Sequence, residues 1–294
     1  MNKVPDTVAL DEPMNARSML GHELPDPSTA SAPSGVARRI ASRLRDLGGG
    51  GPPRRRRRPP DPNHACDNIE RFLAEARTSI RTRGVALSRN VGGQVVGKKV
   101  ADEYGERGLR RRLADHGEIA IDKGLSDNFL LAVKQTSGFI ALLDALVRRF
   151  EVYALVRNPL AVFTSWQTLP FHPQDGHVRL GEGIDFDLRA RLATMPDRVD
   201  RQLEILGWYF AKIRDCVPAA NVIRYEELVR SRGRVLVAMT ERAGELDVEL
   251  QDRNRNRELH DPRVVRSLGE RLLAIDGAWW HFYTEDSVRE LLPA

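Results

Sequence analysis

The 294-residue chain contains two cysteines, Cys66 and Cys216, which lie far apart in the sequence. Such a pair gives no disulfide framework and no metal-binding spacing, so we expect a reduced protein without a metal site. Long apolar runs are also missing. No stretch reaches the length of a membrane span, and the N-terminal residues MNKVPDTVALDEP lack the apolar centre of a signal peptide. These absences predict a cytoplasmic protein with no membrane span.

Hydrophobic residues nevertheless make up 41% of the chain, which is enough for a sizeable core in one α/β domain. The formal net charge is +5. A basic protein suits an anionic ligand, and it also suits nucleic acid, so charge alone leaves both partners open.

Segment 15–62 is rich in Pro, Ser, Gly and Ala and contains the basic run Arg54–Arg58. We predict a disordered linker here, with the arginines solvated, and do not expect nucleic acid as the partner. Apolar residues at helical spacing indicate one short helix between Val36 and Leu47. The rest of the chain then divides into an N-terminal strand segment, 1–14, in which Thr7–Leu10 form the strand, and an α/β domain, 63–294.

The most informative stretch is Phe150–Trp166, FEVYALVRNPLAVFTSW. Val152–Val156 has the apolar, β-branched and aromatic composition of a buried strand. Arg157 follows the strand, Asn158 is a favourable N-cap, and a proline at the next position starts a helix. A helix N-terminus beside an arginine is an anion site, with Ser165 as a further donor. The alternative is an arginine that caps a sheet edge beside a solvated serine.

Two further strands are indicated, Phe129–Val133 and Asn221–Arg224. A helix over Ser137–Arg149 joins the first of them to the Val152–Val156 strand, which makes a βαβ unit with parallel strands. Lys134 and Arg157 then both lie at carboxyl ends of strands, where open α/β sheets bind ligands. These signals predict a three-layer α/β sandwich with a central parallel sheet.

The other elements follow from periodicity and capping residues. We expect helices starting at Asp67 and ending at Gly84, over Leu109–His116, Pro196–Val217, Gly233–Ala243, Pro262–Ala274 and Glu285–Leu292. Gln167–Thr194 is polar and is predicted to be a substrate loop. Its histidines, His172 and His177, are interpreted as surface residues.

Gly92–Lys99, GGQVVGKK, matches a phosphate-binding P-loop except that Lys99 replaces the Ser or Thr that holds magnesium. A P-loop joins a buried strand to a long helix, whereas the sequence that follows here is broken by glycines. We therefore predict a glycine-rich hairpin or loop. A P-loop kinase stays as an alternative function.

The sequence of Phe150–Trp166 resembles the 3′-phosphate-binding motif of sulfotransferases, with Arg157, Pro159 and Ser165 at the matching positions. The resemblance extends from about Cys66 to Tyr283 and is nearest to bacterial members. It implies a P-loop-NTPase-like sulfotransferase fold and the cofactor 3′-phosphoadenosine 5′-phosphosulfate (PAPS). It also implies that Tyr225, in the segment RYEEL, packs against adenine, and that Arg253, in the segment RNRNR, closes over the cofactor.

For catalysis, the resemblance implies that Lys134 serves the sulfate and that Glu12 is a candidate general base, with an ion-pairing Glu12 as the alternative. The family's Gly/Ser/Thr-rich loop for the 5′-phosphosulfate has no counterpart, and we expect the fold to be N-terminally incomplete. The implied reaction moves a sulfuryl group to a hydroxyl or amine of a small-molecule or carbohydrate acceptor. The alternatives are an inactive cofactor-binding remnant and the kinase. Neither the acceptor nor the oligomeric state follows from the sequence.

Overall fold

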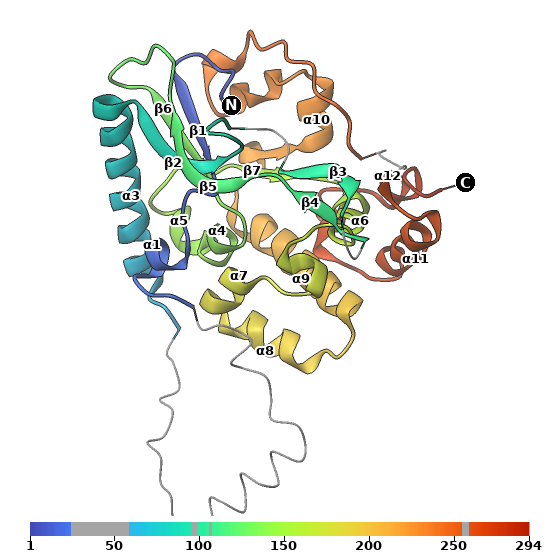
Figure 1. The fold of residues 1–294 in the computed structure, drawn as a ribbon. Helices are drawn as coiled ribbons and strands as arrows, with labels where there is room; N and C mark the ends of the chain where they lie inside the picture. The colour runs from blue at the N-terminus through green and yellow to red at the C-terminus, as the bar shows by residue number, and fades with distance from the viewer. Residues whose placement is uncertain (25–58, 96–98, 106–107, 255–258, 294) are drawn as a thin grey trace, which may run out of the picture.

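The computed structural model describes residues 1–24, 59–95, 99–105, 108–254 and 259–293 (Figure 1). In these residues the chain is a mixed α/β protein, as predicted. Its strands are β1 (Thr7–Asp11), β2 (Val85–Asn90), β3 (Val100–Tyr104), β4 (Arg110–Arg112), β5 (Asp115–Ala120), β6 (Leu130–Lys134), β7 (Ala154–Val156) and β8 (Val222–Arg224). The segment predicted as a helix between Val36 and Leu47, and the run Arg54–Arg58, lie outside the described residues.

The described strands form four pairs and not the single central parallel sheet of the prediction. Two pairs are parallel, β1 with β6 and β7 with β8. The other two, β2 with β5 and β3 with β4, are antiparallel. The three strands expected at Phe129–Val133, Val152–Val156 and Asn221–Arg224 are present as β6, β7 and β8. Strand β6 is shifted by one residue, β7 is two residues shorter than predicted, and β8 is one residue shorter. The parallel partner of β6 is the N-terminal strand β1.

The β1–β6 pair determines where two candidate catalytic residues lie. Its register places Asp11 opposite Lys134, so Glu12 follows directly at the carboxyl end of the pair. The Glu12 backbone N–H donates to the Lys134 carbonyl at 2.6 Å. Glu12 has a φ of 43°, a left-handed conformation that is uncommon for a residue with a side chain. The backbone turn therefore holds Glu12 against Lys134.

The longer helices are α3, α6, α8, α9 and α11, and shorter ones connect them. The helices are α1 (Ala16–Leu20), α3 (Pro62–Arg83), α4 (Ser137–Ala141), α5 (Leu143–Leu146), α6 (Pro159–Trp166), α7 (Arg179–Ile184), α8 (Phe186–Thr194), α9 (Arg198–Cys216), α10 (Tyr225–Arg230), α11 (Pro262–Leu273) and α12 (Glu285–Arg289). In Figure 1, α3 flanks the strands on one side, and α4, α7, α8 and α9 lie below them.

The first long helix begins earlier than predicted. Its N-cap is Asp61, whose side chain accepts from Asn63, and a proline occupies the first helical position. Asp67 therefore lies inside the helix, where it pairs with Arg149. The predicted end is confirmed: Gly84 has a φ of 67°, a left-handed conformation that glycine adopts without steric cost.

The predicted linker 15–62 is partly wrong. Residues 16–20 form α1, which Asn15 and Ser18 close with a reciprocal capping box. Met19 is fully buried, and Asn68 of α3 donates to its carbonyl at 3.1 Å. The apolar contacts of Met19 and Leu20 against α3 outweigh the polar composition of the surrounding sequence.

Three further predictions are corrected. Leu109–His116 is not a helix: it supplies β4 and the start of β5, because pairing with β3 and β2 overrides local propensity. Gln167–Thr194 is not one loop, since it contains the 3₁₀ helix η3 (His172–Asp175), α7 and α8. The helix expected over Ser137–Arg149 is divided into α4 and α5 at Leu142, and Gly233–Ala243 forms two 3₁₀ helices, η5 (Arg234–Ala238) and η6 (Glu241–Ala243).

The largest apolar core surrounds α6 and α9 and includes Phe163, Ile205 and Trp279. Six of the eight α6 residues are buried, so packing fixes the position of this helix. The aromatic residues of Trp279–Tyr283 contribute to this core through the 3₁₀ helix η8 (Ala278–His281). Helix α6 carries Ser165 and begins directly after Arg157 and Asn158 of the predicted anion site.

Candidate functional site

The turn from β7 into α6 has the predicted geometry. Strand β7 ends at Val156, Arg157 follows, and the Asn158 side chain caps the helix by accepting from the Leu160 N–H at 3.0 Å. Pro159 is the first helical residue, where its missing N–H costs no hydrogen bond. The sequence thus places Arg157 at the entrance to a helix by local chemistry alone.

Arg157 contacts the two other residues expected to bind the cofactor. Its guanidinium carbon lies 4.9 Å from the centre of the Tyr225 ring. Its Nη2 donates to the Arg253 carbonyl at 2.7 Å, and its Nε donates to Asn254 Oδ1 at 2.7 Å. The Tyr225 hydroxyl accepts from the Arg253 N–H at 3.1 Å and donates to the Gln251 carbonyl at 2.8 Å. Arg157, Tyr225 and the Arg253 backbone therefore form one cluster.

A carboxylate lies at the N-terminus of α6. Glu226 Oε1 accepts from the Asn158 N–H at 3.1 Å and from the Asn254 side chain, while Oε2 accepts from the Tyr283 hydroxyl at 2.8 Å. This position suits a negative group because of the helix dipole. Protein groups therefore already satisfy part of the helix N-terminus, and an anionic ligand here depends on side chains more than the sequence suggested.

Ser165, the further donor expected at the anion site, contacts a second arginine, Arg110. Its Oγ accepts from Nη2 of Arg110 at 3.4 Å, and Thr168 Oγ1 accepts from the Arg110 Nε at 3.1 Å. Arg110 is only 7% exposed, and burial lowers its pKa from the ordinary value. Arg110 was not among the predicted site residues, because its segment, Leu109–His116, was predicted to be a helix.

The positive charges of Arg110 and Arg157 both act on the His260 imidazole. Burial is the larger cause and the positive charges of Arg110 and Arg157 add to it, and together they lower the pKa of His260 to about 4. His260 is therefore a neutral imidazole at neutral pH.

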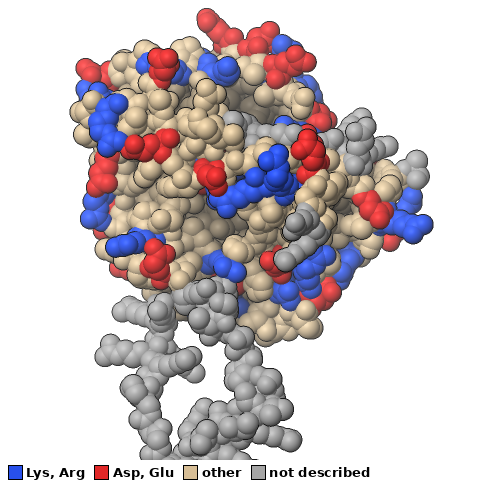
Figure 2. All heavy atoms as spheres, in the orientation of Figure 1, with Lys and Arg blue, Asp and Glu red and all other residues tan. Residues whose placement is uncertain are grey.

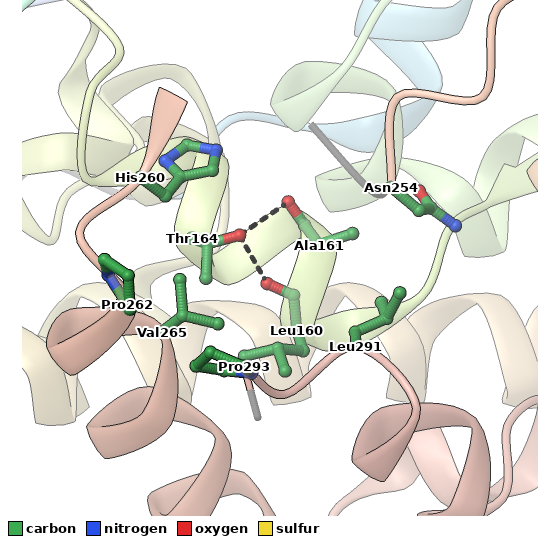
Figure 3. Close-up of a pocket in the computed structure, with 9 residues that line it drawn as sticks. All are labelled: Leu160, Ala161, Thr164, Asn254, His260, Pro262, Val265, Leu291 and Pro293. Carbon is green, nitrogen blue, oxygen red and sulfur yellow. Dashed lines mark hydrogen bonds between the residues drawn. The ribbon is translucent and has the colours of Figure 1, made fainter. Parts of the chain in front are cut away.

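A small pocket opens beside this cluster (Figure 3). Its volume is about 70 Å³, which accommodates a few atoms but not a nucleotide. Figure 3 shows His260, Thr164 and Asn254 along one side and apolar side chains along the other. The lining residues are Leu160, Ala161, Thr164, Asn254, His260, Pro262, Val265, Leu291 and Pro293. A nucleotide near Arg157 would thus lie on the open surface and not inside this pocket.

Lys134 and Glu12 form a second cluster at the carboxyl end of β1 and β6. Lys134 Nζ lies 2.8 Å from Glu12 Oε1 and 3.2 Å from Asp11 Oδ1. The Thr136 hydroxyl also donates to Glu12. The structure therefore brings together the two residues proposed for catalysis, and it places them in an ion pair.

The Glu12 carboxylate has two more cationic neighbours, which the sequence analysis did not associate with it. Arg89 Nε lies 2.7 Å from Glu12 Oε2, and Lys99 Nζ lies 3.4 Å from the same atom. Lys99 also pairs with Asp11 at 2.8 Å. Nη1 of Arg89 is buried and has no hydrogen-bond partner among the described residues.

These charges determine the protonation states. Burial would raise the pKa of Glu12, but the charges of Lys134 and Lys99 outweigh it and hold the pKa well below the usual range. Burial would lower the pKa of Lys134, but Glu12 and Asp11 raise it above the ordinary value. Burial and the Lys134 charge lower the pKa of Lys99. A carboxylate with so low a pKa is a weak general base, so this arrangement fits the ion-pairing role of Glu12 better.

The Gly92–Lys99 stretch does not have the geometry of a P-loop. Gly92 and Gly93 form a tight turn closed by a bridge between Val91 and Gln94, as the predicted hairpin requires. The next element, β3, is a strand, whereas a P-loop leads into a helix N-terminus. Residues 96–98 lie outside the described residues.

Comparison with protein-family models, with curated proteins and with solved structures gives no match for this chain. Among the described residues no helix is long and apolar enough to cross a membrane. The part of the chain that the structure describes also contains no group of three His, Cys, Asp or Glu side chains arranged to hold a metal ion. Function therefore has to be argued from the two charged clusters.

Proposed function

We propose that this chain is a sulfotransferase that uses PAPS, with the 3′-phosphate at the Arg157 cluster and the sulfuryl end at Lys134. The observation that carries the proposal is the arrangement beside α6 of Arg157, whose guanidinium lies over the Tyr225 ring and bonds the Arg253 carbonyl, and of Arg110, which bonds the Ser165 hydroxyl. A dianionic phosphate would bind such guanidinium groups through charge-assisted hydrogen bonds. The fold we propose is the P-loop-NTPase-like sulfotransferase fold, of which the parallel pairs β1–β6 and β7–β8 would be parts.

The residues present fit a 3′-phosphoadenosine group. Arg157 uses Nε and Nη2 in the contacts described above, and a guanidinium has five N–H donors, so others are available to phosphate oxygens. Arg110 brings a second guanidinium next to the Ser165 hydroxyl. One face of the Tyr225 ring packs against Arg157, and adenine would stack against the ring from its other side.

When bound, PAPS supplies an activated sulfuryl group whose transfer forms an S–O or S–N bond to the acceptor as the S–O bond to the phosphate breaks. Lys134 would stabilise the negative charge on the departing phosphate. Glu12 holds the Lys134 ammonium at the end of β1 in the ligand-free chain. The acceptor is proposed to be a small molecule or carbohydrate, and the location cytoplasmic.

The test is turnover. The purified chain is incubated with PAPS and a panel of hydroxyl and amine acceptors, and release of adenosine 3′,5′-bisphosphate is followed by chromatography. Release that depends on acceptor and is lost in Lys134→Ala supports the proposal. Selective binding of the bisphosphate without any turnover would identify the cofactor-binding remnant. Binding of ATP with Mg²⁺ in preference to the bisphosphate would reject the proposal in favour of a kinase.

A further inference from the structure

The β3–β4 hairpin connects the two charged clusters. Lys99 precedes β3 at one end, beside Asp11 and Glu12. At the other end Tyr104 is paired with Arg110, which contacts Ser165. Figure 2 shows Lys and Arg side chains gathered across the middle of this face, in the region where Figure 1 places β3 and β4.

Strand β3 separates Lys99 from Tyr104, and its pairing with β4 shifts register between Val100 and Tyr104. We infer that this hairpin is a two-ended clamp for a nucleotide with anionic groups at its 3′ and 5′ positions, in which Arg110 contacts the 3′-phosphate and Lys99 the 5′ group. This inference rests on the proposed function and names two ligand-binding residues beyond those the sequence indicated.

The hairpin is anchored where a clamp needs support. The Arg110 N–H donates to the Thr168 carbonyl at 2.8 Å, which ties β4 to the end of α6. The Tyr104 hydroxyl donates to the Leu259 carbonyl, next to His260. At the Lys99 end, the Lys99 ammonium pairs with Asp11 at 2.8 Å. A backbone contact thus ties the hairpin to the Arg157 cluster, and an ion pair ties it to the cluster of Asp11 and Glu12.

Each end also carries cationic capacity that the described residues leave unused. At the Lys99 end three cations, Arg89, Lys99 and Lys134, face two carboxylates, and Nη1 of Arg89 is buried without a partner in the described chain. At the Arg110 end the nearest hydrogen-bond partners are the neutral hydroxyls of Ser165 and Thr168. The Asp102 charge also acts on Arg110, but the hydrogen bonds described for the Arg110 guanidinium go to these two hydroxyls.

A matched set of variants assigns each end to one phosphate. Arg110→Ala is expected to weaken binding of adenosine 3′,5′-bisphosphate and of adenosine 3′-monophosphate about tenfold or more, with little change for the 5′-monophosphate. Lys99→Ala is expected to weaken binding of adenosine 5′-monophosphate about tenfold or more, with little change for adenosine 3′-monophosphate. Arg111→Ala is the control, because Arg111 lies on the same hairpin with a 66% exposed side chain. Its binding of all three nucleotides should match that of the parent in calorimetric titration.

The clamp is rejected if either variant binds both monophosphates with equally reduced affinity. It is also rejected if either variant binds both with unchanged affinity. If Arg110→Ala does not fold, hydrogen exchange on the parent decides: the bisphosphate should slow exchange of the amides in 99–105, and unchanged exchange at saturation rejects the inference. The two proposals fail differently. A parent that binds no bisphosphate rejects the proposed function, whereas bisphosphate binding that needs Arg157 but neither Lys99 nor Arg110 rejects only the clamp.

Discussion

The Arg157 guanidinium lies over the Tyr225 ring, 4.9 Å from its centre, and connects the end of β7 to the start of α10. The two residues are far apart in sequence, and the parallel pairing of β7 with β8 brings them together. A stacked arginine is held in one orientation, so less conformational entropy is lost when it binds an anion. The Tyr225 hydroxyl supports this arrangement through its bonds to Gln251 and Arg253.

Tyr225→Phe keeps the ring over Arg157 and removes the hydroxyl that joins Gln251 and Arg253. The free energy of unfolding should fall by about 1 kcal/mol, the usual net value of a hydrogen bond, as measured by urea denaturation. Tyr153→Phe is the control, since that hydroxyl bonds only the side chain of the nearby Glu151. An equal loss in both variants would contradict a specific role for the Tyr225 hydroxyl.

His260 reports the charge of the arginine cluster. In the free protein its pKa is about 4, and an anion beside Arg110 and Arg157 should raise that pKa, because it offsets the positive charges that lower it. The measurement is NMR titration of the His260 ring with and without adenosine 3′,5′-bisphosphate. A pKa that does not change at saturation would place the phosphates elsewhere.

The same residue makes stability depend on pH. Because the folded pKa is depressed, the unfolded chain binds the His260 proton more tightly. The free energy of unfolding should therefore fall as the pH drops from about 6.5 towards 4. His260→Gln should flatten this part of the stability profile in denaturant titrations at several pH values. His281→Gln is the control for a histidine on the exposed surface. A profile that keeps its slope in His260→Gln would refute the assignment.

Much of the candidate site could be predicted from the sequence where local chemistry determines the structure. Asn158 and Pro159 start α6 through capping, which needs no distant contact, so Arg157 was placed correctly. Lys99 and Arg110 could not be assigned, because their positions depend on the β3–β4 pairing and on contacts with residues far along the chain. The same cause explains the wrong helix at Leu109–His116: strand pairing is non-local.

Met19 tests whether residues 15–24 belong to the folded domain. Its side chain is fully buried in an apolar cluster with Cys66 and Ile69. Met19→Ala should lower the free energy of unfolding by about 2–5 kcal/mol, the usual cost of truncating a buried methionine. Arg17→Ala, on the exposed side of the same helix, should change it by less than about 0.5 kcal/mol. If both variants unfold like the parent in urea, α1 does not contribute to the core.

Glu12→Gln removes the carboxylate that three cations share. The loss of these charge-assisted contacts should lower the free energy of unfolding at pH 7 by about 1–3 kcal/mol. Because the folded pKa of Glu12 is depressed, its stabilising effect is present at neutral pH and declines as the pH falls below about 4.5. The difference between parent and variant should therefore shrink in acid. Glu103→Gln, with an 83% exposed side chain, is the control. A difference that stays constant with pH would show that Glu12 acts without its charge.

The central claim is a 3′-phosphate site at Arg157, and calorimetric titration with two nucleotides tests it. The parent should bind adenosine 3′,5′-bisphosphate more tightly than adenosine 5′-monophosphate. Arg157→Ala should weaken bisphosphate binding roughly ten- to a hundredfold, Ser165→Ala should cost less, and neither should change monophosphate binding. Arg230→Ala on α10, with an exposed side chain, should behave like the parent. A parent that binds both nucleotides equally, or an Arg157→Ala variant that melts like the parent and still binds the bisphosphate at full strength, would contradict the account.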